Sequence, residues 1–305
     1  MTATSATTTT TDRQRGLAVL ALVGAAFIFG TAFTTVKRAT QDVAPMPFIA
    51  VRFLVGALVL TPFAARRPRT RGVARAGLFA GLALSLGYVA QTIGLQYTDE
   101  STSAFITYML VVFVPLIAAV LTRTWPTRTA TVGVALAAVG LFFLSNGGSG
   151  LGVGRGESLT LLCALGFASH IIVLDRFAGR QDVFWLNIVQ LATVGLICLV
   201  PGALSGGYRF PLSAWLAAIY LGVAASAAAF VLQTWAQAHI EPTRASLLLI
   251  LEPVFAAVFS AVLGRPLGAR GAVGAVCIFV GIVVVERGRA STAGGAGMVA
   301  ADVAH

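Results

Sequence analysis

Ten apolar stretches dominate this chain and restrict it to the folds that a lipid bilayer permits. They cover about residues 17–36, 46–65, 76–96, 102–121, 129–146, 158–174, 183–203, 212–236, 243–263 and 270–285. Most approach or exceed the roughly 20 residues that a helix needs to cross about 30 Å of hydrocarbon. We expect the shorter stretches at 129–146, 158–174 and 270–285 to be less tilted or to thin the bilayer locally. The alternating pattern of a β-barrel is absent, so the sequence predicts an all-α polytopic membrane protein with ten transmembrane helices.

Lysine and arginine residues are distributed unevenly between the two ends of these predicted helices. With the N-terminus inside, the inner segments carry Arg13, Arg15, Arg66, Arg67, Arg69, Arg71, Arg75, Arg123, Arg128, Arg176, Arg180, Arg244, Arg287 and Arg289, and the outer loops only Lys37, Arg38, Arg155, Arg209, Arg265 and Arg270. Cytoplasmic loops collect basic residues, so we predict a bacterial-type inner (plasma) membrane protein with both termini cytoplasmic. The net charge of +10 then reflects the inner face, and no nucleic-acid partner is expected.

An internal repeat divides the membrane region into two halves. A shift of 142 residues places Gln91-Thr92 on Gln233-Thr234 and residues 119–121 on 261–263, where both read Ala-Val-Leu. Each half contains five predicted helices, an odd number, so the second half enters the membrane in the opposite sense to the first. Such inverted repeats can open one central cavity to either side in turn, which is typical of secondary transporters. The alternative is a duplication that only supplies a stable bundle.

The repeat and the composition together predict the organisation of the chain. We expect a disordered cytoplasmic tail at 1–15, a first five-helix repeat at 16–147, a Gly-rich linker at 148–157, a second five-helix repeat at 158–288 and a flexible cytoplasmic tail at 289–305. The linker lacks the Lys-Ser/Thr pair of a phosphate-binding loop, which disfavours an ATP-driven pump. The three cysteines have no metal-like spacing, so neither a metal nor a cofactor is expected.

No catalytic pattern stands out in the sequence. It contains no HExxH motif, no Asp-rich pair and no defensible Ser/His/Asp set, so we do not expect an enzyme. Two alternatives to a transporter stay open: a membrane-embedded transferase acting on lipid-linked substrates, and a non-transporting scaffold. A flux measurement separates transport from both, and chemical modification of a substrate would favour the enzyme.

Two segments resemble a known transporter family. The run FIFGTAFTTVKRATQDVAPMPFIAVRFLVGALVL is similar to the opening of the EamA-type transporters of the drug/metabolite transporter superfamily, with Phe29-Gly30 where a Trp-Gly-like pair is usual and Arg52 at the family arginine. The run ASLLLILEPVFAAVFSAVLGRPLG is similar to that family's Leu-Glu-Pro segment and following Leu-Gly-Glu. Arg265 replaces the second glutamate, which argues against carrying over an acidic role there. The resemblance covers about residues 16–288 and implies export of small metabolites, amino acids or drug-like organic compounds by alternating access.

Two charged residues inside predicted spans are the main candidates for a functional site. Arg52 lies five residues inside the apolar run that starts at Pro47, and Glu252 lies near the middle of the ninth span. A charge in hydrocarbon costs a few kcal/mol at least and usually faces a cavity or a partner. Arg52 could attract an anionic group or steady Glu252, or it could snorkel to the outer headgroups. Glu252 could be a proton or cation site, or it could accept hydrogen bonds freed at Pro253.

Other polar or helix-bending residues in the spans complete the candidate cavity. Pro115 and Pro253 are expected to break or bend their helices and expose carbonyl groups, unless neighbouring helices satisfy those groups. The polar candidates are Gln91, Tyr108, His170, Gln190 and Gln233, which could instead form interhelical hydrogen bonds. Among them, the imidazole is also a candidate for proton coupling. Glycines in the third, fifth and tenth spans fit either close helix packing or a homodimer face.

Overall fold

The computed structural model describes residues 4–98, 100–144, 154–262 and 268–302, and all regular elements in those ranges are helical. The first half contains α1 (Thr4–Asp42), α2 (Pro45–Ala64), α3 (Val73–Gly94), α4 (Glu100–Tyr108), α5 (Leu110–Thr122) and α6 (Arg128–Leu144). The second half contains α7 (Arg155–Phe177), η1 (Ala178–Arg180), α8 (Val183–Leu204), α9 (Leu212–Leu221), η2 (Gly222–Ala228), α10 (Ala229–Gln237), α11 (Pro242–Leu249), α12 (Leu251–Val262) and α13 (Ala269–Asp302).

These helices form ten apolar segments that match the ten predicted spans. Nine segments of the described chain are long and apolar enough to cross a membrane, and α6 is a shorter apolar helix. Four spans are composite: α4 with α5, α7 with η1, α9 with η2 and α10, and α11 with α12. The prediction of an all-α polytopic membrane protein with ten transmembrane helices is therefore confirmed.

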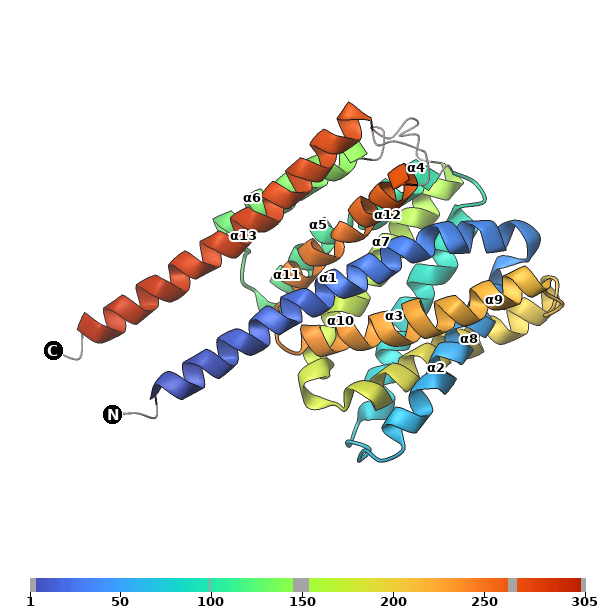
Figure 1. Ribbon diagram of the computed structural model, residues 1–305, viewed down its shortest axis with the longest axis horizontal. Coiled ribbons are helices and arrows are strands. Elements are labelled where there is room, and N and C mark those ends of the chain that lie inside the picture. Colours follow the sequence, from blue (N-terminus) through green and yellow to red (C-terminus); the bar gives the residue numbers. More distant parts are fainter. Residues whose placement is uncertain (1–3, 99, 145–153, 263–267, 303–305) are drawn as a thin grey trace.

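The two halves interlock rather than forming separate bundles. The most extensive contacts join helices of opposite halves: α2 with α8, α3 with α7, and α6 with α13 (Figure 1). These pairs run antiparallel; Gly133 lies beside Gly281, for example, and Gly140 beside Gly274. In the repeat, α1 is equivalent to α7, α3 to α10 and α5 to α12. The α3–α7 contact therefore has its equivalent in the α10–α1 contact, and the α1–α12 contact in the α7–α5 contact. All four contacts are present. The arrangement is that of two inverted five-helix repeats.

The two terminal segments differ from the expected disordered tails. Helix α1 begins at Thr4 and α13 ends at Asp302, and both project from the same end of the bundle (Figure 1). A helix that already exists can be extended without the cost of a new nucleus, so a polar Thr-rich or Ala-Gly-rich segment can continue it. Most of the predicted Gly-rich linker lies outside the described residues.

Close backbone approach between α6 and α13 depends on glycine. A Cβ atom at Gly140 would lie 2.5 Å from the carbonyl oxygen of Gly274 and 2.8 Å from the amide nitrogen of Ile278. We therefore expect Gly140→Ala to lower the free energy of unfolding by about 1–3 kcal/mol, as overpacking commonly does. Gly24→Ala is the matched control, because its Cβ would lie 3.8 Å from Leu232 Cδ1, an ordinary contact. Thermal unfolding in detergent measures both variants, and equal stability of the two would contradict this packing.

Candidate functional site

Two of the composite spans are interrupted at equivalent points of the repeat. The span of α4 and α5 breaks at Met109 (φ −58°, ψ −9°), and the span of α11 and α12 breaks at Ile250 (φ −66°, ψ −7°). At Met109 the turn tightens, because its amide donates to the carbonyl of Ile106 (3.1 Å) and its own carbonyl accepts from Val112 (2.9 Å). Broken spans of this kind expose helix ends to a central site in transporters.

The two predicted helix-breaking prolines relate differently to these interruptions. Pro253 lies in the first turn of α12, three residues after the break at Ile250. The first amide groups of a helix have no partner within it, so the missing amide hydrogen of Pro253 costs no hydrogen bond at this position. Pro115 lies inside α5, and the break of that span is six residues earlier at Met109. No proline or glycine marks the break in the first repeat.

A cavity of about 380 Å³ lies at the interface of the two repeats. Its walls come from α1, α2, α3, α7 and α10 and from both interrupted spans. The sequence-predicted residues that line it are Arg52, Gln91, Tyr108, His170, Gln233 and Glu252. Exposed Gln41 and Gln96, at the end of α1 and just after α3, lie at its mouth. The folded chain thus brings together candidates from six different helices.

Arg52 points inward from α2. It is only 4% exposed, and it lies about 10 Å along the helix axis from Pro45, where α2 begins. Its Nε donates a hydrogen bond to Ser226 Oγ (3.1 Å), and its guanidinium carbon lies 5.2 Å and 5.3 Å from the ring centroids of Phe53 and Tyr88. Cation–π contacts of this kind partly compensate a desolvated charge. The guanidinium lines the cavity rather than reaching the outer headgroups.

Glu252 faces the same cavity from the first turn of α12. The phenol of Tyr108, the last residue of α4, interacts with its carboxyl group, so one residue from each interrupted span meets here. Among the described residues no ion pair joins Glu252 to Arg52, although the two charges share one cavity and attract each other across it. A polar solute can therefore contact both charges without first breaking a salt bridge between them.

A buried polar network orients His170. Gln190 Nε2 donates to Asn187 Oδ1 (2.6 Å), so Gln190 Oε1 is left to accept a hydrogen bond from His170 Nε2 (2.9 Å). Thr234 Oγ1 also donates to Asn187 Oδ1 (3.3 Å), which ties α7, α8 and α10 together. Gln190 thus lies behind the cavity wall and holds the ring, whereas the ring itself lines the cavity. This assignment makes Nε2 a donor and leaves Nδ1 as the acceptor of a neutral imidazole.

The repeat-related glutamines have different surroundings in the two halves. Gln91 is half-buried and its Nε2 donates to Thr107 Oγ1 (3.3 Å), whereas Gln233 is buried and donates to Gln237 Oε1 (3.1 Å). The neighbouring threonines differ in the same way: Thr92 lines the cavity, but Thr234 is fully buried. Both glutamines line the cavity, but the threonines are in unequal states, because Thr92 faces the cavity and Thr234 does not.

Two residues that contact Arg52 were missed by the sequence reasoning, and one of them, Tyr88, also lines the cavity. Ser226 belongs to η2, a π-helical segment that packs closely on α2, since a Cβ atom at Gly56 would lie 2.8 Å from Ser226 Cβ. Tyr88 lies on α3 three residues before Gln91, so the two share a helix face, and that spacing could have marked it. π-helical segments often occur at functional sites, but no sequence pattern signalled this one.

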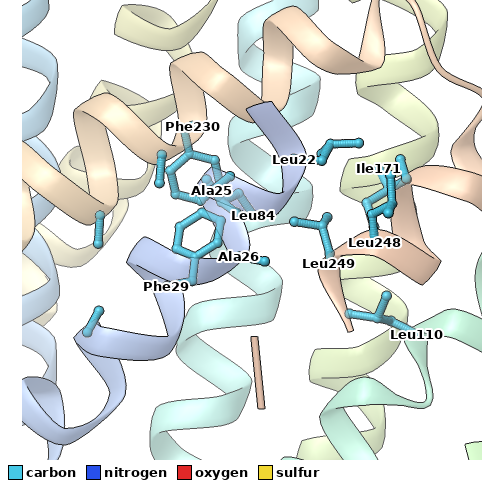
Figure 2. Close-up of a cluster of buried hydrophobic side chains, with 14 of the residues drawn as sticks. Leu22, Ala25, Ala26, Phe29, Leu84, Leu110, Ile171, Phe230, Leu248 and Leu249 are labelled. Carbon is cyan, nitrogen blue, oxygen red and sulfur yellow. The ribbon is translucent and has the colours of Figure 1, made fainter. Parts of the chain in front are cut away.

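An apolar floor closes the cavity at the end of the bundle where the chain termini lie. Figure 2 shows how side chains from α1, α3, α5, α7, α10 and α11 converge in one apolar cluster. The floor comprises Leu22, Ala25, Ala26, Phe29, Leu84, Leu110, Ile171, Phe230, Leu248 and Leu249. Beyond it, ion pairs join Arg244 to Glu286 and Arg67 to Asp182. The cavity is thus open at the opposite end and shut at this one.

A match between this chain and a protein-family model decides its family. The model of the EamA-like transporter family matches the chain twice, over residues 16–146 and 154–287. The chain belongs to the EamA-like transporter family. It is similar to an uncharacterized transporter of Archaeoglobus fulgidus, with 32% identity over 277 residues that cover 90% of this chain and 87% of the relative. The uncharacterized transporter YoaV of Bacillus subtilis is 23% identical, over 79% of this chain and 86% of its own length.

A solved crystal structure also shares the fold of this EamA-like protein. It superposes with a TM-score of 0.74 at 19% identity and covers 88% of this chain and 95% of its own. The EamA-like assignment makes the protein an integral membrane transporter with two copies of the family repeat.

Proposed function

We propose that this protein is a secondary transporter that exports small metabolites, amino acids or drug-like organic compounds by alternating access. The observation that carries the proposal is the cavity between the repeats, where Arg52 and Glu252 provide opposite charges beside an interrupted span. Polar groups in a membrane span are costly, and their convergence on one cavity supports a solute pathway. Phe48, Phe167 and Phe230 supply apolar walls for the non-polar part of such a solute.

The unequal environments of the repeat-related threonines, Thr92 and Thr234, support the proposal of alternating access. With the arginine-rich end in the cytoplasm, the open mouth faces outward and the apolar floor seals the cytoplasmic side. Exchange of the two packing arrangements between the inverted repeats would close the mouth and open the floor. The ion pairs Arg244–Glu286 and Arg67–Asp182 would then part, because they join segments that lie beneath the floor.

Glu252 is the proposed coupling site for protons. Its carboxyl group has a cavity surface, one hydroxyl partner in Tyr108 and an opposite charge within electrostatic reach at Arg52. A carboxylate in such a place can carry a proton inward when a solute leaves outward. His170 lies in the same cavity and is the second candidate, with its Nδ1 as the proton acceptor.

Flux into proteoliposomes tests the function. Uptake and counterflow of a mixed panel of radiolabelled amino acids and small organic cations should reveal saturable, protein-dependent transport of a subset. An imposed pH gradient should accelerate that flux, and equal rates with and without the gradient would contradict proton coupling. Absence of flux across the panel, together with protein-dependent modification of a lipid-linked donor, would favour the transferase instead.

A further inference from the structure

A second concavity lies on the membrane-facing side of the protein, away from the solute cavity. It is a groove of about 480 Å³ between α12 and α13, which make little contact with each other in the described chain. Its lining is apolar except at one end and comprises Val254, Ala275, Val276, Phe279, Val280, Val283, Val284 and Arg287. From Ala275 to Arg287 the groove follows about 18 Å of helix axis. That length is close to one leaflet, half of the roughly 30 Å hydrocarbon core.

The polar end of the groove carries uncompensated positive charge. Arg287 is exposed there, and its neighbour Glu286 is already paired with Arg244. Gly288 of α13 packs against Thr129 of α6, which brings exposed Arg128 to the same end of the bundle. In the described part of the chain no acidic side chain pairs with Arg128 or Arg287. This end is also the one where most arginines of the sequence gather.

We propose that the groove binds one anionic phospholipid, with an acyl chain between α12 and α13 and the headgroup phosphate at Arg287 and Arg128. The apolar lining matches a hydrocarbon chain, the length matches one leaflet, and basic pockets between transmembrane helices at the cytoplasmic face select anionic headgroups. Val254, in the wall of the groove, lies two residues after Glu252. The bound chain therefore contacts the interrupted span that carries the cavity carboxylate.

A second copy of this protein fits the groove less well than a lipid. Two copies with the same membrane orientation are related by an axis along the membrane normal, so like ends of the two molecules meet. Arg128 and Arg287 of both copies would then face one another at one end of the interface, and like charges repel. A phosphate at the same place neutralises these charges instead.

Native mass spectrometry of the full chain in detergent tests the site. Titration with phosphatidylglycerol and with phosphatidylcholine should reveal one retained phospholipid, with preference of at least about fivefold for the anionic lipid. The double variant Arg128→Gln with Arg287→Gln should lose that preference. Val280→Trp should lower retention of both lipids because the indole fills the groove.

Matched variants separate the groove from general effects. Arg66→Gln removes an exposed arginine from the same end of the bundle, and Val273→Trp adds an indole to an exposed position of α13 outside the groove. Both variants should retain phospholipid with the same preference for the anionic lipid as the wild type. The proposal is overturned if the arginine pair can be removed without loss of preference, or if the wild type shows no preference. A dimer that dissociates in Val280→Trp would instead assign the groove to a second copy.

Discussion

Replacing Glu252 with glutamine is expected to lower substrate flux about 10- to 100-fold in a protein that still folds. The amide has nearly the same shape and can still accept the hydrogen bond of Tyr108, so only the charge is lost. Hydrogen bonds to charged groups contribute about 1.5–3 kcal/mol, which corresponds to about 10- to 100-fold in binding or rate. Initial rates in proteoliposomes, normalised to folded protein, provide the measurement.

Two further variants make the Glu252 prediction specific. Glu241→Gln removes an exposed carboxylate at the start of α11, outside the cavity, and should transport like the wild type. Tyr108→Phe removes only the hydroxyl partner and should have an intermediate effect, because a neutral donor contributes about 1 kcal/mol. An imposed pH gradient should accelerate substrate flux through the wild type but not through Glu252→Gln. Unchanged, gradient-driven flux in Glu252→Gln would remove this residue from the transport cycle.

Arg52→Gln is expected to weaken substrate binding about 10- to 100-fold, by the same reasoning for a charged partner. Arg52→Lys should not restore binding, because an ammonium group cannot keep the Ser226 hydrogen bond while facing Phe53 and Tyr88 as a planar guanidinium does. Ser226→Ala keeps the charge and should cost only about fivefold. Equilibrium binding of a transported compound, with its concentration dependence, measures all three.

Thermal unfolding distinguishes a binding role of Arg52 from a purely structural one. The guanidinium is buried, so its removal leaves Ser226 without this partner and lowers stability to some extent. A binding role requires that affinity falls in the fraction of protein that remains folded. Wild-type affinity in that fraction, accompanied by a large loss of stability, would make Arg52 a packing residue.

Much of the fold could be predicted because hydrophobicity and repetition act over long stretches. Most spans are apolar runs near the length that a bilayer demands, and the 142-residue shift relates the two halves without any knowledge of their contacts. The same logic identified Arg52 and Glu252, since an isolated charge in a span is conspicuous.

Local backbone and tertiary details were less predictable. The break at Met109 lacks a proline or glycine, so only its tertiary setting distinguishes it from a regular helix. Pro115 suggested a break but lies within α5, where one missing hydrogen bond is tolerated. The roles of Ser226 and Tyr88 depend on which helices pack against Arg52. Those helix contacts cannot be read from a single sequence.

Exchange of states between the two repeats is tested most directly at the repeat-related pair Thr92 and Thr234. In a background without Cys163, Cys198 and Cys277, a membrane-impermeant maleimide should label Thr92→Cys from the outside and leave Thr234→Cys unlabelled, because only Thr92 lines the open cavity.

During transport of a substrate, labelling of Thr92→Cys should fall, and Thr234→Cys should become reactive from the cytoplasmic side. Reciprocal changes at these two positions are what alternating access between inverted repeats predicts. If Thr234→Cys stays unreactive while flux proceeds, or if both positions react from the same side, the account is contradicted.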